Sequence, residues 1–246
     1  MKPVRPENAG IWHLYKQGGI TPAITSLFNP GSAQHMAYIR SMMKEQRKQS
    51  LYEIGLEDME AVVFDLETTG FSPYNGDEII SIGAIAVVGE QVMDSETFYT
   101  PVNPKRKIPE VVVELTGLTN EAAASATELL PALSDFMDFI RQRILLAHGS
   151  GHDKHFLNAA LWKTSKTSLN HRLLDTMMIA KWLHPGSRSL SLDALLDYYE
   201  IPCINRHHAL ADSRMTAKLW SLQLNEILSR GVNTLGDLYS RLSVYG

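Results

Sequence analysis

The chain has 246 residues, of which 44% are hydrophobic and 20% charged, an ordinary composition for a soluble globular protein. Its one cysteine, Cys203, excludes an intrachain disulfide, and neither a membrane-spanning apolar run nor the apolar core of a signal peptide is present. The net charge of -4 argues against nucleic-acid binding through bulk positive charge, although metal ions can supply that charge locally. We therefore expect a cytoplasmic protein with no membrane partner.

The first 58 residues differ from the rest, and we expect them to form a helical N-terminal extension. Residues 29–34 predict a loop, and residues 35–55 predict a helix that carries cations on one face beside an apolar strip. The cations are Arg40, Lys44, Arg47 and Lys48, and the strip is Met36, Ile39 and Met43. We favour a solvated face beside a docking strip. The alternatives are contact with a phosphate backbone, or a surface for a polymerase, a repair complex or a second copy of the chain.

From Ala61 onward the pattern indicates a sheet covered by helices. Residues 61–67 predict one strand, and residues 77–101 predict two more, joined through Gly89 and Glu90. Residues 111–143 are mainly helical after Asn120, residues 144–149 form a strand, and residues 153–164 form a helix. Residues 171–176 predict a last strand, and helices follow over residues 177–184, 190–200 and 209–230.

Two carboxylates mark the end of the first strand. Alternate side chains of a strand share a face, so Asp65 and Glu67 point the same way before Thr68, Thr69 and Gly70 end the strand. Two charges held close repel by about 4 kcal/mol at ~4 Å and an effective dielectric near 20, so a proton or a cation must lie between them. The alternative is a solvent-facing pair at the strand end.

Three residues later in the chain, two acids and one histidine, are further candidates for the same site. Asp153 follows a strand at the start of a helix, where the helix dipole favours an anion; alone it reads as an N-cap. His207 and Asp212 are five residues apart and would diverge by about 140° on one helix. They converge only if His207 lies in the loop or cap before the helix and Asp212 in its first turns.

In this order, Asp65/Glu67, Asp153 and His207/Asp212 resemble the signatures of the DEDDh family of 3′-5′ exonucleases. The segments "DLETTGF", "ELTGLTNE", "HHALADS" and the run from "LLDT" to "LSLDALLDYYEIP" carry the resemblance over residues 60–230. It implies a ribonuclease-H-like mixed sheet flanked by helices. We therefore divide the chain into an extension (1–58), an exonuclease domain (59–230) and a C-terminal tail (231–246).

The resemblance also implies a role for each residue. Asp65, Glu67, Asp153 and Asp212 would hold two Mg²⁺ or Mn²⁺ ions, because hard cations prefer oxygen ligands. His207 would be the general base for the attacking water. Main-chain groups of Thr68, Thr69 and Gly70 would receive the terminal nucleotide of a single-stranded or frayed 3′ end, with Phe71 against its base. The alternative for Phe71 is an ordinary core residue.

The middle motif departs from the family pattern. Where relatives commonly read His-Asn-x-x-Phe-Asp, this chain reads His148-Gly149-Ser150-Gly151-His152-Asp153. His152 either contacts the substrate or is an idle loop residue. Thr116 stands where many relatives carry His, and we read it as a variant substrate contact.

The favoured function is a metal-dependent 3′-5′ exonuclease that releases 5′-mononucleotides from DNA in proofreading or repair. The same chemistry on RNA is a close alternative, which recognition of the 2′-hydroxyl would decide. A non-catalytic nucleic-acid-binding module of a polymerase complex is disfavoured, because all four carboxylates and His207 are present. An HD-type phosphohydrolase, suggested by His152-Asp153, is disfavoured by the strands around Asp65.

Overall fold

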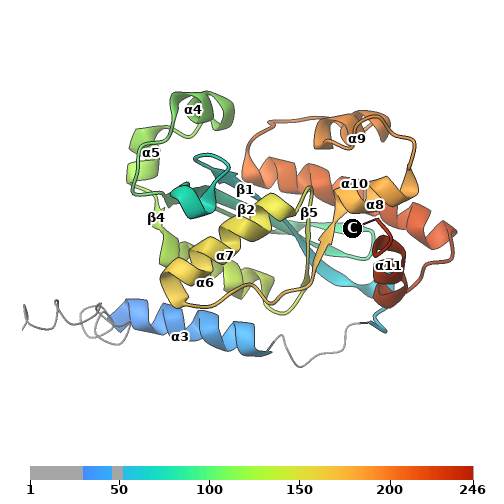
Figure 1. The fold of residues 1–246 in the computed structure, drawn as a ribbon, viewed down its shortest axis with the longest axis horizontal. Coiled ribbons are helices and arrows are strands. Elements are labelled where there is room, and N and C mark those ends of the chain that lie inside the picture. Colours follow the sequence, from blue (N-terminus) through green and yellow to red (C-terminus); the bar gives the residue numbers. More distant parts are fainter. Residues whose placement is uncertain (1–29, 46–51, 246) are drawn as a thin grey trace, which may run out of the picture.

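The computed structural model describes residues 30–45 and 52–245, and its centre is a six-stranded mixed sheet in the order β4-β3-β2-β1-β5-β6 (Figure 1). The strands are β1 (Glu60–Thr68), β2 (Ile79–Val88), β3 (Gln91–Asn103), β4 (Thr127–Glu128), β5 (Ile144–Ala147) and β6 (Leu173–Asp175). The hairpins of β1, β2 and β3 are antiparallel, whereas β5 runs parallel to both β1 and β6. The predicted mixed sheet with flanking helices is confirmed.

The sheet is buried on both faces, as the long apolar runs of its central strands require. On β1, Val62, Phe64 and Leu66 contribute to one core, and Ala61 and Val63 contribute to the other. The first core is closed by α3 (Pro30–Glu45), α6 (Leu129–Ile140) and α7 (Gly151–Ser165). The second is closed by α8 (Thr176–Leu183), α10 (Ala209–Ser229) and α11 (Leu235–Leu242).

Shorter helices lie at the ends of this sandwich. They are η2 (Leu56–Asp58), η3 (Pro73–Asn75), α4 (Glu110–Thr116), α5 (Asn120–Ala124) and α9 (Leu192–Tyr198). In Figure 1, α4 and α5 form one lobe and α9 forms another on the same side of the molecule. Within the described ranges, no helix combines the length and apolar character that a membrane span requires.

The N-terminal helix is an integral part of this packing. Met36, Ile39 and Met43 are buried, so the predicted apolar strip is confirmed. The prediction of a loop over residues 29–34 is wrong from Pro30 onward, because α3 begins there; proline is favourable in the first turn, where its missing N–H needs no partner. Arg40 and Lys44 are exposed on α3, while Arg47 and Lys48 lie outside the described residues.

The other end of the chain also packs onto the domain. The segment expected as a C-terminal tail contains α11, whose Leu235, Leu238 and Leu242 are buried in the second core. The side chain of Thr234 caps this helix by accepting a hydrogen bond from the N–H of Asp237. Residues 235–242 therefore form a helix that packs onto the second core.

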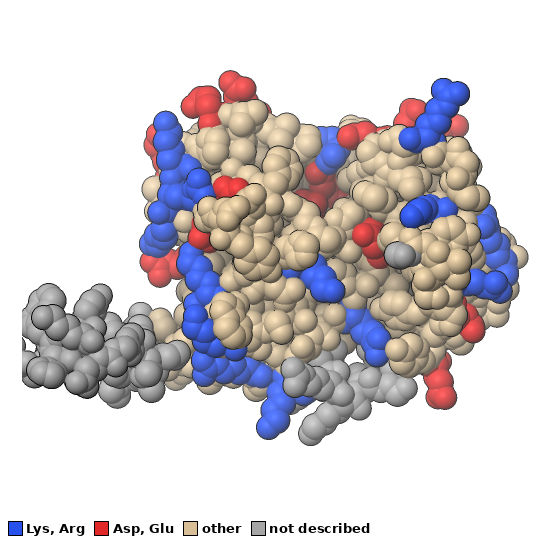
Figure 2. Space-filling view, viewed as in Figure 1, with Lys and Arg blue, Asp and Glu red and all other residues tan. Residues whose placement is uncertain are grey.

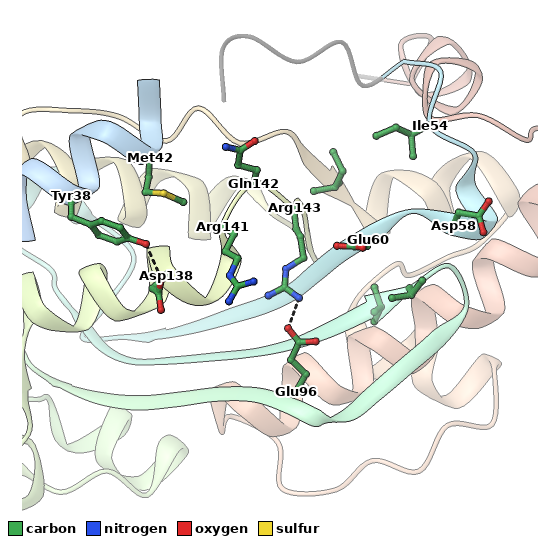
Figure 3. Close-up of a pocket in the computed structure, with 13 residues that line it drawn as sticks. Tyr38, Met42, Ile54, Asp58, Glu60, Glu96, Asp138, Arg141, Gln142 and Arg143 are labelled. Atoms are coloured by element: carbon green, nitrogen blue, oxygen red, sulfur yellow. Dashed lines mark hydrogen bonds and ion pairs between the residues drawn. The ribbon is translucent and has the colours of Figure 1, made fainter. Parts of the chain in front are cut away.

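A hollow of about 980 Å³ lies beside the start of β1 and β5 (Figure 3). Some of its polar side chains pair with one another: Arg143 donates to Glu96 at 2.6 Å, and the Tyr38 hydroxyl donates to Asp138 at 2.9 Å. Glu60, the first residue of β1, lines this hollow, whereas Asp65 and Glu67 lie in the second half of that strand and do not line it. This hollow is therefore separate from the predicted site.

Candidate metal centre

The strand β1 delivers two half-buried carboxylates to the face of the sheet that α10 covers. Asp65 and Glu67 continue the alternation of Ala61 and Val63, which confirms that the pair shares a face. Gly83, the partner of Asp65 on β2, lets α10 approach: a Cβ there would lie 2.2 Å from the main chain of Ala209 and Leu210. The start of α10 therefore lies directly beside Asp65.

The start of α10 supplies the third carboxylate. His207 lies in the loop before the helix with φ 61°, and Asp212 is buried in its first turn, as the spacing predicted. Asp212 accepts a hydrogen bond from the main-chain N–H of His207 at 3.1 Å and another from the Arg206 guanidinium. Ligand atoms of Asp65, Glu67 and Asp212 all lie within 4.8 Å of one another.

Asp153 approaches the cluster from α7. It is buried in the first turn of that helix, where the main-chain N–H of Leu66 donates to its carboxylate. In the described part of the chain, the group whose ligand atoms lie within 4.8 Å of one another comprises Asp65, Glu67 and Asp212, and Asp153 is not part of it. The charge of Asp153 nevertheless helps to raise the pKa of Asp65. The four predicted acids therefore share one electrostatic environment.

The loop before α7 is held by a residue that the sequence analysis did not single out. Asp175, at the N-terminus of α8, accepts hydrogen bonds from the main-chain N–H groups of Gly149 at 2.9 Å and Ser150 at 2.8 Å. Gly149 has φ +67°, a conformation that favours glycine, which accounts for its place in the unusual middle motif. This clamp sets where α7 begins and so positions Asp153.

Burial and mutual repulsion hold protons on the acids. Burial, then the charges of Asp153, Glu67 and Asp212, raise the pKa of Asp65 well above its ordinary value. Burial and the charge of Asp212 raise the pKa of Glu67 to about 7, and burial is also the main cause that raises the pKa of Asp153 to about 8. The charge of Arg206 opposes these shifts for Asp65 and Glu67. Such environments are typical of sites built to receive a cation.

The residues present fit divalent metal ions. The Oδ1 atom of Asp212 is buried and has no hydrogen-bond partner in the described part of the chain, an arrangement that is costly unless a ligand completes it. Asp65, Glu67 and Asp212 offer oxygen ligands, which Mg²⁺ and Mn²⁺ prefer. They open into a hollow of about 340 Å³ that is also lined by His207 and Arg206.

Figure 2 shows acidic side chains at the bottom of a hollow between the lobe of α4 and α5 and the lobe of α9. The α9 side is tied to the centre through Arg206, whose Nε donates to Asp193 at 2.6 Å. His148 also reaches this side, because its Nε2 pairs with the carbonyl of Leu190 at 2.9 Å. Arg206, Asp193 and His148 were not predicted as site residues.

The residues predicted to bind substrate differ in their exposure to solvent and in whether their side chains already form hydrogen bonds. Phe71 is 88% exposed and its ring lies 5.8 Å from that of His152, so the core alternative for Phe71 is wrong. The Thr68 hydroxyl donates to the carbonyl of Gly70 and lies 3.3 Å from Nε2 of His152. Thr69 is buried, and its hydroxyl donates to Asp77 at 3.0 Å. The side chain of Thr69 therefore shapes the turn, while Phe71 is exposed to solvent and His152 is half-buried beside it.

Two more residues, Thr116 and Tyr99, have contacts in the structure that the sequence did not predict. The Thr116 hydroxyl donates to the carbonyl of Val112 and accepts from the N–H of Leu118, so it serves the end of α4; its predicted substrate role stays a prediction. Tyr99 on β3 was not singled out. It stacks on His208 with ring centroids 4.5 Å apart, and burial followed by the charge of Glu67 raises its pKa.

Comparison with known proteins identifies the protein family to which this chain belongs. The family model described as "Exonuclease" (RNase_T) matches residues 62–220, and the chain belongs to this exonuclease family. Over 183 residues it is 31% identical to a PolC-type DNA polymerase III of Caldanaerobacter subterraneus, covering 74% of this chain and 13% of that protein. An epsilon-like protein of DNA polymerase III from Rhodobacter capsulatus is 30% identical over 215 residues, covering 87% of this chain and 30% of that protein.

A solved structure supports the same fold. Exonuclease X in complex with 5′ overhanging duplex DNA matches with a TM-score of 0.56 and 20% identity, covering 68% of this chain and 92% of that one. The predicted ribonuclease-H-like fold and the resemblance to DEDDh exonucleases are thereby confirmed. The chain spans less than a third of the length of the two polymerase relatives named above.

Proposed function

We propose that this chain is a metal-dependent 3′-5′ exonuclease that releases 5′-mononucleotides from the 3′ end of DNA. The observation that carries the proposal is the meeting of Asp65, Glu67 and Asp212 within 4.8 Å, with Asp153 and His207 beside them. The polymerase relatives favour DNA as the substrate and proofreading or repair as the setting. RNA is the competing substrate.

The proposed roles follow from where the side chains stand. The four carboxylates would hold two divalent ions, with Asp212 contributing the Oδ1 atom that lacks a partner among the described residues. Ions bound there would supply the charge that activates the attacking water and stabilises the leaving 3′-oxygen. His207 lines the same hollow and would accept the proton of that water. Thr68, Gly70, Phe71 and His152, which contact one another, would receive the terminal nucleotide.

The proposed catalytic unit comprises residues 59–230, on which α3 and α11 pack. Because the apolar strip of α3 is already buried within this chain, a polymerase or repair partner would contact other surfaces of the extension. The length of the polymerase relatives favours an exonuclease that works inside a larger assembly.

The direct test is digestion of DNA and RNA oligonucleotides, labelled at either the 3′ or the 5′ end, with Mg²⁺, Mn²⁺ or EDTA. We expect early release of the 3′ label as a 5′-mononucleotide, dependence on metal, and faster digestion of DNA. His207→Ala is expected to lower the rate by about 10²- to 10⁴-fold. Activity that persists in Asp65→Ala, or that removes the 5′ label first, would refute the assignment.

A further inference from the structure

Among the described residues, four exposed aromatic rings and the half-buried ring of His152 lie between the candidate centre and the end of α7. The rings of Phe71 and His152 have their centroids 5.8 Å apart. Tyr74 on η3 is 73% exposed, and its ring lies 6.4 Å from that of His155, which is itself exposed. Trp162, one turn before the end of α7, is 61% exposed. Large exposed aromatic side chains on one continuous surface need a reason, because their burial would be favourable.

Tyr74 and Trp162 also line a common groove. This groove has a volume of about 350 Å³ and lies between η3 and α7, with Phe156 and Ala159 at its wall. Phe156 is buried and packs against His152, with ring centroids 4.7 Å apart, so the wall of the groove contacts the aromatic pair beside the metal centre.

The charges around this groove suit a polyanion. Its two acids are already paired, Glu78 with Lys163 at 2.5 Å and Asp77 with Arg106 at 3.0 Å. The Nζ atom of Lys166 lies 5.7 Å from the centroid of the Trp162 ring.

The positive charge continues onto α3. Arg40 is exposed, and its Nε donates to the carbonyl of Ser165 at 2.8 Å, which fixes the cation of α3 beside the end of α7. Figure 2 shows Lys and Arg side chains over the end of α7 and over α3.

We propose that this aromatic and basic path, from Phe71 to Trp162 and Lys166, binds the single-stranded segment immediately 5′ of the 3′ terminus. Aromatic faces accept any base, and a line of cations follows the phosphates, which is how single strands are bound without sequence preference. This inference rests on the proposed function, since it assigns the substrate of that site as a single strand several nucleotides long. It also gives the predicted cationic face of α3 a role through Arg40.

The length of this path determines how many nucleotides a substrate needs in order to contact Trp162. Trp162 follows Asp153 by nine positions, and a helix rises about 1.5 Å per residue, so the two lie about 14 Å apart along the helix. Stacked nucleotides advance about 3.4 Å each, so Trp162 would meet approximately the fourth nucleotide from the end. A dinucleotide would not reach it, and a decanucleotide would.

The test compares the full-length wild type with Trp162→Ala and Lys166→Gln, using a thymidine dinucleotide and decanucleotide with Mn²⁺. Matched controls are Tyr198→Ala, which removes another 61% exposed aromatic ring, and Lys218→Gln, which removes an exposed lysine of α10. Binding of the labelled decanucleotide is measured separately by fluorescence anisotropy in EDTA, and folding by thermal unfolding.

We expect Trp162→Ala to lower the kcat/KM ratio of decanucleotide to dinucleotide by about 5- to 160-fold, the range for loss of one base stack. It should weaken binding in EDTA by a similar factor. Lys166→Gln should reduce the slope of log affinity against log salt by about 0.7. A folded Trp162→Ala protein with an unchanged ratio and unchanged binding would overturn the path and leave the exonuclease proposal standing. Failure of the wild type to cleave either substrate would refute that proposal, and the anisotropy data would still decide the path.

Discussion

The clustered acids should make the metal-free protein less stable than it would be without them, and Glu67→Gln tests this directly. Glu67 is half-buried beside Asp212, and burial followed by that charge raises its pKa from 4.5 to about 7. Glutamine keeps the size of the side chain and removes the charge. The variant should therefore be more stable than the wild type when no metal is present and the cluster is ionised.

The magnitude and its pH dependence follow from linkage. Below about pH 4.5 Glu67 is protonated in both the folded and unfolded states, so its charge has no effect on stability there. Between about pH 4.5 and 7 the unfolded chain releases the proton and the folded chain keeps it, so the wild type loses stability as pH rises. Above about pH 7 the loss is complete and amounts to about 3 kcal/mol, an upper figure because the acids influence one another.

The assay is urea unfolding of both proteins in EDTA at pH 5 and pH 8, repeated with saturating Mn²⁺. We expect Glu67→Gln to gain 1–3 kcal/mol on the wild type at pH 8 and much less at pH 5. Mn²⁺ at about a hundred times its Kd should add about 2.7 kcal/mol to the wild type, and less to the variant. Glu114→Gln, on the exposed face of α4, is the control. If Glu67→Gln is less stable than the wild type in EDTA at pH 8, the electrostatic reasoning is wrong.

Three further variants probe the supports of the centre. Gly83→Ala should lower both the melting temperature and the exonuclease rate, because its Cβ would lie 2.2 Å from the start of α10; overpacking of this kind costs about 1–3 kcal/mol. Ile39→Ala, in the fully buried strip of α3, should cost about 2–5 kcal/mol in urea unfolding, and an unchanged midpoint would show that α3 is only loosely attached. Arg206→Gln should move the acidic limb of Mn²⁺ binding to higher pH, because Arg206 lowers the pKa of Asp65 and Glu67; titration calorimetry across pH would check this.

Local spacing was enough to predict much of the centre. The two-residue period of a strand placed Asp65 and Glu67 on one face, and the five-residue spacing required His207 to precede the helix that carries Asp212. Both statements depend on geometry within a few residues, which the sequence contains.

Contacts between distant segments could not be predicted in the same way. Gly83 matters only because α10 crosses it, and the role of Asp175 depends on a loop 25 residues earlier in the chain. Arg206 was overlooked because its neighbour His207 carried the motif, and the direction of a long flexible side chain is set by its partners. The loop predicted over residues 29–34 failed because proline and glycine were read as turn residues, whereas proline also begins helices.

Arg206 gives the centre a built-in cation, and this explains how the fold tolerates so many acids in one place. Its guanidinium pairs with Asp193 and Asp212, so one charge of the cluster is offset within the chain itself. The pKa values of Asp65, Glu67 and Asp153 are raised, so these groups can hold protons until a cation arrives. Metal ligands must be deprotonated, so each ion that binds would displace protons from these acids. The bound ion would also lie near the positive charge of Arg206. We therefore expect the cluster to weaken the metal-free fold and to make the affinity for metal rise with pH.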